Sequence, residues 1–207
     1  MAGVSRFNRL ALLVVIGAGP LTGCALTPRN ATLIYPPAEP EGAVSVAHAA
    51  TPPASNGISI TVLPFVDRRA DTTKVGGVRN GFGMKLASIR TVNSVAAWVP
   101  EALTYELKAA GYAAAPAATA PDTSLAISGE ILKAETDAYF TYGGEVELLV
   151  TLTDGDRELI RRTYIGKGSG GTNWGATAKS YAQSLSMALA DVLRQVIADV
   201  GNAVAAE

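Results

Sequence analysis

VELLVTLTDGDRELIRRTYIG, residues 146–166, is the stretch that most directly specifies the fold. Apolar residues occupy every second position of its first half: Val146, Leu148, Val150 and Leu152. This period of two predicts a strand with one buried face. Asp154-Gly155 is a strong signal for a tight hairpin turn. We therefore predict an antiparallel hairpin whose second strand runs from about Glu158 to Gly166.

Two helices and three further strands are expected around this hairpin. The strands have apolar alternation or β-branched residues, and are predicted at Ile58–Val66, Tyr112–Ala115 and Ser124–Glu135. The helices have apolar stripes at helical spacing, and are predicted from about Ser94 to Ala110 and from about Trp174 to Val200. The resulting order, β-α-β-β-β-β-α, predicts an α+β fold with a mixed or antiparallel sheet of about five strands covered by two helices.

Two glycine-rich stretches are interpreted as irregular. Asp67 to Asn93 has no apolar period and contains three glycine signals, so we expect a long loop. Gly166 to Gly171 precedes the final helix and superficially resembles a phosphate-binding loop, but it lacks the Walker spacing. We interpret it as a flexible connection between strand and helix.

The N-terminus carries the features of a cleaved signal peptide. Arg6 and Arg9 precede a short apolar run, and Leu21-Thr22-Gly23-Cys24 follows it. This tetrad resembles the lipobox of bacterial lipoproteins, in which the cysteine carries a diacylglycerol and becomes the new N-terminus. The run is about half the length that a membrane-spanning helix needs. We therefore expect a signal peptide over residues 1–23 and lipid attachment at Cys24.

Residues 24–56 are predicted to be the lipidated cysteine and a tether, and residues 57–205 a single globular domain. The stretch from Ala25 to Asn56 is rich in Pro and Ala and shows no sustained period. The alternative is that Leu33-Ile34-Tyr35 docks on the domain as an extended arm.

Charge and composition exclude several classes of function. Loss of residues 1–23 removes two arginines and no acids, which changes the net charge from −1 to −3. The chain has no surplus of basic residues, so we do not expect nucleic acid as a partner. The chain has a single cysteine and a single histidine, His48 in the tether, which argues against a Cys/His metal centre and against a His-based catalytic triad. We expect no cofactor, no metal and no enzymatic activity.

Two clusters are candidate partner-binding surfaces. Asp67, Arg68 and Arg69 follow the first strand; they could form a charged latch that fixes the next loop, or a recognition patch. Arg79 and Arg90 extend this cluster, so the loop 67–93 is our first candidate for the working surface. The second is the aromatic turn from Tyr139 to Tyr142, which could instead belong to the core.

Several short motifs resemble the YajG family of bacterial lipoproteins. They are Ile60–Arg69 (ITVLPFVDRR), Val75-Gly76, Ala102-Leu103 and Leu107–Tyr112 (LKAAGY). The element order is also similar to auxiliary lipoproteins of ABC-type export systems. The resemblance implies an envelope protein without established catalysis, and it supplies no ligand. The proline-rich tether and the long glycine-rich loop depart from the family pattern.

These observations predict a non-enzymatic lipoprotein that acts through protein contacts in envelope assembly or transport. Ala25 follows the lipidated cysteine instead of Asp, which by the sorting rule of enteric bacteria implies the outer membrane, with the domain facing the periplasm. The sequence leaves the oligomeric state open. The alternatives are a binding module for a glycan, lipid or peptide, and a hydrolase.

The lipobox interpretation makes the thiol of Cys24 indispensable for anchoring. We expect Cys24→Ser to prevent acylation, so that the protein accumulates as an unprocessed precursor or leaves the membrane fraction. Metabolic labelling with a fatty acid and membrane fractionation measure this. Normal acylation of the variant would contradict the assignment.

Overall fold

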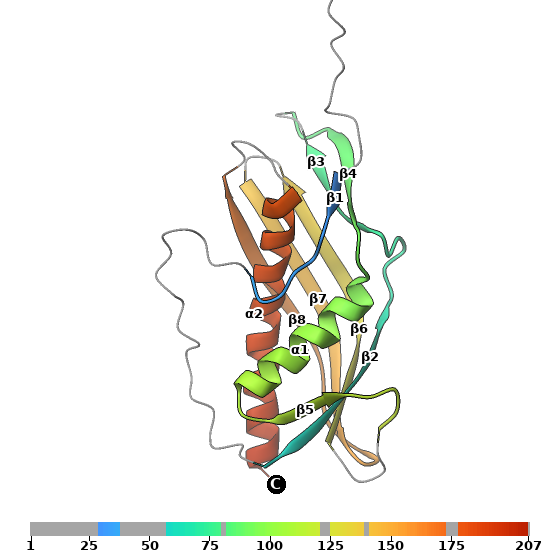
Figure 1. Ribbon diagram of the computed structural model, residues 1–207, viewed down its shortest axis with the longest axis vertical. Coiled ribbons are helices and arrows are strands. Elements are labelled where there is room, and N and C mark those ends of the chain that lie inside the picture. The colour runs from blue at the N-terminus through green and yellow to red at the C-terminus, as the bar shows by residue number, and fades with distance from the viewer. Residues whose placement is uncertain are drawn as a thin grey trace, which may run out of the picture.

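The long strand β6 organises the sheet (Figure 1). The computed structural model describes residues 29–37, 57–79, 82–120, 125–138, 141–172 and 178–206. The strands in these ranges are β1 (Arg29–Ala31), β2 (Ser59–Asp67), β3 (Lys74–Arg79), β4 (Lys85–Thr91), β5 (Ala113–Pro116), β6 (Leu125–Ala138), β7 (Thr141–Asp154) and β8 (Arg157–Thr172). The helices are α1 (Val95–Ala109) and α2 (Ala178–Ala205).

The predicted α+β class, with a mixed sheet and two helices, is confirmed. The described residues form eight strands, so the expected number of about five was too low. On one edge of β6 lies β7 and then β8, both antiparallel to their neighbour. On the other edge β2 and β3 follow each other along β6, both parallel to it. β5 extends the sheet beyond β2, and β4 and then β1 extend it beyond β3.

The hairpin predicted from residues 146–166 is the pair β7 and β8. Val146, Leu148, Val150 and Leu152 are all at most 1% exposed, as the alternation predicts. The turn places Asp154 opposite Arg157, and Gly155 has a φ of 55°, a left-handed conformation that glycine adopts without strain. Both strands continue well beyond the predicted ends.

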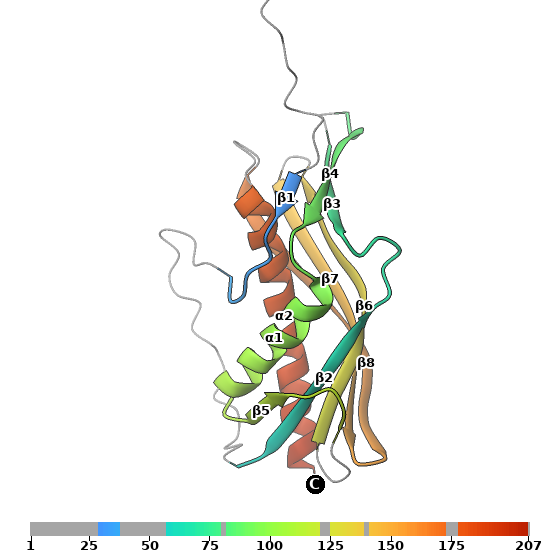
Figure 2. The same ribbon diagram turned by 45° about the vertical axis from the view of Figure 1, so that its right-hand side comes forward.

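Both helices lie on the same face of the sheet (Figures 1 and 2). The predicted stripes are confirmed by burial of Val95, Val99, Leu103 and Leu107 in α1, and of Tyr181, Leu185, Leu189, Val192, Val196 and Val200 in α2. Helix α1 begins at Val95 and includes Pro100, so the proline is accommodated inside the helix. The buried stripes and the inward side chains of the strands form one hydrophobic core.

Helix α2 packs directly against glycines of β7 and β8. A Cβ at Gly144 or at Gly168 would lie 2.2 Å from the carbonyl oxygen of Ser184. A Cβ at Gly166 would lie 2.2 Å from that of Ala188. The interpretation of residues 166–171 as a flexible connection is therefore wrong: β8 runs through them to Thr172. The role of Gly166 and Gly168 is to let the helix pack closely on the strand, and not to make the chain flexible.

The prediction of a long loop from Asp67 to Asn93 is also wrong, because this stretch contains the hairpin of β3 and β4. In β4, Ala87 and Ile89 are buried and alternate with less buried residues. In β3, Gly76 lies so close to β6 that a Cβ there would overlap the carbonyl oxygen of Thr136. These small residues hide the strand from pattern analysis because they carry little β-propensity.

Residues 29–37 pack on the domain, as the docked-arm alternative proposed. Arg29 pairs with Ile89 where β1 runs parallel to β4. The backbone N–H of Leu33 donates to Oδ1 of Asn93 (2.8 Å), and Nδ2 of Asn93 donates to the Leu33 carbonyl (3.0 Å). The Tyr35 hydroxyl donates to Oε1 of Glu106 (2.5 Å). The tether predicted for residues 24–56 therefore does not hold for residues 29–37.

Residues of β7 on the two faces of the hairpin should contribute differently to stability. Leu148 is fully buried, whereas Thr151 lies on the other face and is partly exposed. We expect Leu148→Ala to lower the free energy of unfolding by about 2–5 kcal/mol through the cavity that it leaves. Thr151→Ala, the matched control, should cost much less. Chemical denaturation measures both, and equal losses would show that Leu148 is not in the core.

Candidate functional site

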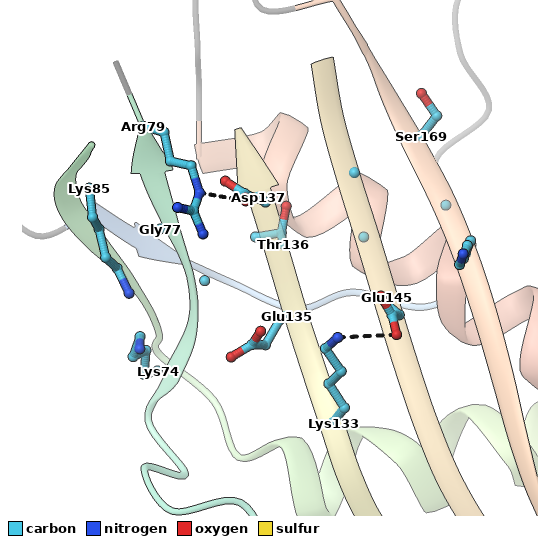
Figure 3. A pocket seen from close by; sticks show the side chains of 15 residues that line it. Lys74, Gly77, Arg79, Lys85, Lys133, Glu135, Thr136, Asp137, Glu145 and Ser169 are labelled. Carbon is cyan, nitrogen blue, oxygen red and sulfur yellow. Dashed lines mark hydrogen bonds and ion pairs between the residues drawn. The ribbon is translucent and has the colours of Figure 1, made fainter. Parts of the chain in front are cut away.

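A hollow of about 720 Å³ lies on the face of the sheet that the helices leave open (Figure 3). Its floor is formed by the ends of β3, β6, β7 and β8 that lie together. Glu135 on β6 and Glu145 on β7 line it, whereas their neighbours Ala134 and Val146 are fully buried on the helix side. Strand alternation therefore directs the polar side chains of these strands into the hollow.

The hollow is rich in cations. Its charged side chains are Lys74, Arg79, Lys85, Lys133 and Lys167 against Glu135, Asp137 and Glu145. This is a surplus of two positive charges on a chain whose net charge is negative. A concave surface with one dominant sign attracts a partner of the opposite sign.

Two ion pairs hold part of this set in place. Nε of Arg79 donates to Oδ2 of Asp137 (2.7 Å), and NH1 of Arg79 donates to the Gly83 carbonyl (3.2 Å). Nζ of Lys133 lies 3.1 Å from Oε1 of Glu145 (Figure 3). All four side chains are partly exposed, so these pairs orient the lining and add little stability.

Three lysines of the hollow are left without such a pair. Among the described residues, no carboxylate lies within ion-pair distance of Lys74, Lys85 or Lys167. The neighbouring Lys74 side chain lowers the pKa of Lys85, and desolvation adds to this, while Glu135 opposes it. Two ammonium groups side by side favour an anionic partner, which would compensate both charges.

Asp67 and Arg69, predicted as a latch or a recognition patch, form a buried ion pair outside the hollow. Nε and NH2 of Arg69 donate to the two carboxylate oxygens of Asp67 at 2.9 and 2.7 Å. The guanidinium also donates to the carbonyls of Thr72 and Lys74. The two side chains are 7% and 9% exposed, so the pair fixes the connection from β2 to β3 and offers little surface.

Arg68 and Arg90 make exposed contacts elsewhere on the surface. NH2 of Arg68 donates to Oε1 of Glu130 (2.8 Å), and this contact lowers the pKa of Glu130. NH1 of Arg90 lies 3.5 Å from Oδ2 of Asp71 and donates to the Thr73 hydroxyl. Of the four arginines predicted to act together, only Arg79 lines the hollow.

The other predicted site residues cannot be placed fully. Cys24 and Tyr139 lie outside the described residues, and for Tyr142 only the backbone in β7 is described. Sequence reasoning missed Lys74, Lys85 and Lys167, which come from three strands. The register of the sheet brings them together, for example by placing Glu145 opposite both Glu135 and Lys167.

The edge of β8 beside the hollow is protected by side chains of α2. Nε2 of Gln195 donates to the Ile165 carbonyl (3.0 Å), and the N–H of Lys167 donates to Oδ2 of Asp191 (3.3 Å). These contacts use backbone groups that an added strand would need. This part of the edge is therefore less available to an added strand than the open face of the sheet.

The described part of the chain shows no metal centre: no three His, Cys, Asp or Glu side chains converge there as ligands would. Neither of its two helices combines the length and the apolar character that crossing a membrane requires.

Comparison with known proteins gives a family and a fold. The family model Lipoprotein_16, described as an uncharacterized lipoprotein, matches residues 46–201, and the resemblance to YajG-like lipoproteins is confirmed. A search of curated proteins finds no match.

Solved structures of low sequence identity are similar to this chain, and the first of them has a TM-score that indicates a shared fold. The protein XCC0632 from Xanthomonas campestris, assigned to the family DUF330, is 15% identical with a TM-score of 0.54, over 74% of this chain and 90% of that one. The hypothetical protein CT253 from Chlamydia trachomatis is 12% identical with a TM-score of 0.48, over 72% and 99%. Lipoprotein GNA1162 from Neisseria meningitidis is 14% identical with a TM-score of 0.37, over 72% and 99%.

The different settings of Arg68 and Arg69 lead to a test. Arg69→Ala leaves the carboxylate of Asp67 buried without its partner, and we expect a loss of about 3–5 kcal/mol in the free energy of unfolding. Arg68→Ala, the matched control, removes an exposed pair and should cost far less. Urea titration of both variants measures this, and a small loss in Arg69→Ala would show that the buried pair is dispensable.

Proposed function

The chain belongs to the Lipoprotein_16 family of uncharacterized lipoproteins, and from this premise we propose that it is a lipid-anchored envelope protein that works by binding another protein. The binding surface in this proposal is the cation-rich hollow, and the partner presents an acidic surface. The protein contributes contacts in envelope assembly or transport and carries out no catalysis.

The location follows from the sequence at the anchor. Cys24 carries the lipid in this proposal, and Ala25 at the next position favours the outer membrane, with the domain in the periplasm. Two or three acyl chains on one cysteine give stable attachment, which a single chain does not.

The observation that carries the proposal is the surplus of cations in the hollow. Long strands with a fully packed rear face support its floor, so the charged groups stand on a rigid surface. The open face continues beyond the hollow and includes exposed apolar side chains, among them Ile165, which is 48% exposed. A mixture of charged and scattered apolar groups is typical of protein interfaces.

A binding module for a small ligand is the second candidate, and the hollow fits it less well. Pockets for small molecules are mostly apolar and enclose their ligand. This hollow is lined mainly by charged side chains and glycines and is open to solvent. The apolar chain of a lipid would gain little by entering it.

Charge reversal in the hollow tests the proposal. A photoreactive amino acid at position 169, on the rim, is expected to crosslink the full-length lipoprotein to one protein partner in intact cells. We expect Lys85→Glu with Lys167→Glu to reduce this adduct roughly tenfold or more, because an acidic partner is then repelled. Quantification of the adduct by immunoblotting measures the effect.

The matched control makes the same charge change outside the hollow. Arg157→Glu with Arg161→Glu alters two exposed residues near the other end of β8 and should leave the adduct unchanged. Both double variants should melt within a few degrees of the parent. An undiminished adduct in the hollow variant would remove this surface from the binding site.

A further inference from the structure

The tip of the β3–β4 hairpin presents apolar side chains to solvent. Phe82 is 90% exposed and Met84 is 60% exposed, the first being the most exposed large apolar residue of the described chain. Basic side chains adjoin them, because Arg79 ends β3 and Lys85 begins β4. The tip lies at the end of the molecule that also carries β1, away from the C-terminus (Figures 1 and 2).

The start of β1 points toward the same tip. β1 is parallel to β4 with Arg29 opposite Ile89, so the N-terminal end of β1 points along β4 toward Lys85. Lys85 lies about 13 Å further along this direction than Ile89, given the rise of a strand, and Met84 and Phe82 lie beyond it.

The distance from the anchor to β1 is short. Arg29 lies five positions after Cys24, and the fully extended chain between them spans at most about 18 Å. Arg29 is held on the domain by its pairing with β4 and by its interaction with Tyr181 on α2. The lipid can therefore lie only about 5 Å beyond Lys85 along β4, even when the linking residues are fully stretched.

We propose that the tip formed by Phe82 and Met84 inserts into the interfacial region of the membrane that holds the lipid of Cys24. This inference rests on the proposed lipid anchor and adds a second point of contact. The anchor brings the tip to the bilayer surface, where burial of its apolar side chains is favourable. Lys85 and Arg79 lie where cationic groups meet the anionic headgroups.

Two contacts fix the orientation of the domain, whereas a lipid alone would let it rotate. With the tip inserted, β4 points at the bilayer and the hollow faces sideways near the membrane surface. The turn between β7 and β8 lies at the far end of the molecule (Figure 1).

Site-specific fluorescence tests the insertion. The acylated Cys24 has no free thiol, so Met84→Cys in the full-length lipoprotein gives a single site for an environment-sensitive label, with Phe82 retained. The protein is reconstituted on vesicles of phosphatidylethanolamine and phosphatidylglycerol. We expect a blue-shifted emission and strong quenching by lipids that carry a nitroxide in the headgroup region.

Asp156→Cys is the matched control, because Asp156 is exposed in the turn of β7 and β8. Its label should emit as in water and escape the quencher. In addition, Phe82→Asp should return the label at position 84 to aqueous emission without loss of acylation. An aqueous, unquenched label at position 84 on protein that is acylated and bound to vesicles would overturn the insertion. A parent protein without acyl chains at Cys24 would overturn the anchor and the inference that rests on it.

Discussion

The contact between the backbone of α2 and the glycines of β7 and β8 is the constraint on which the rest of the fold depends. Gly144, Gly166 and Gly168 let the helix approach so closely that any side chain at these positions would overlap its carbonyl groups. Close approach brings Leu185, Leu189 and Val192 into the core. A helix and a sheet that pack at this distance exclude water along their full contact, which makes burial of the apolar stripe effective.

This packing also determines which face of the sheet is open to solvent. Both helices cover one face of the sheet, so the opposite face is left uncovered and is the one available to the proposed partner. β6 connects the two halves of the sheet and carries Lys133, Glu135 and Asp137 on that open face. The rigid core and the polar hollow are thus opposite faces of the same strands.

Much of the architecture could be predicted from the sequence, whereas most of the site could not. The β7–β8 hairpin and both helices show strong periodicity because one face of each is fully buried. The sequence does not predict β3 and β4, because Gly76, Gly77 and Ala87 occupy positions where a strand signal needs large apolar residues. It does not predict β1 because this strand is only three residues long. The hollow depends on register: Lys74, Lys85 and Lys167 become neighbours only when their strands are paired, and single-sequence patterns do not contain that information. The Asp67–Arg69 cluster was identified as charged, but its burial depends on the β2–β3 connection folding over it.

The parallel pairing of β1 with β4 has a mechanical consequence. If Cys24 carries the proposed lipid anchor, a pull between the membrane and the domain enters the fold at Arg29 and acts along the axis of β1. The hydrogen bonds between β1 and β4 are then loaded together in shear, instead of being opened one after another as in unzipping. Behind them, the bonds of Leu33 to Asn93, of Tyr35 to Glu106 and of the Ser186 hydroxyl to the Ile34 carbonyl share the load. Under the proposed anchoring, the docked segment would therefore carry the load before it reaches β2 and the core.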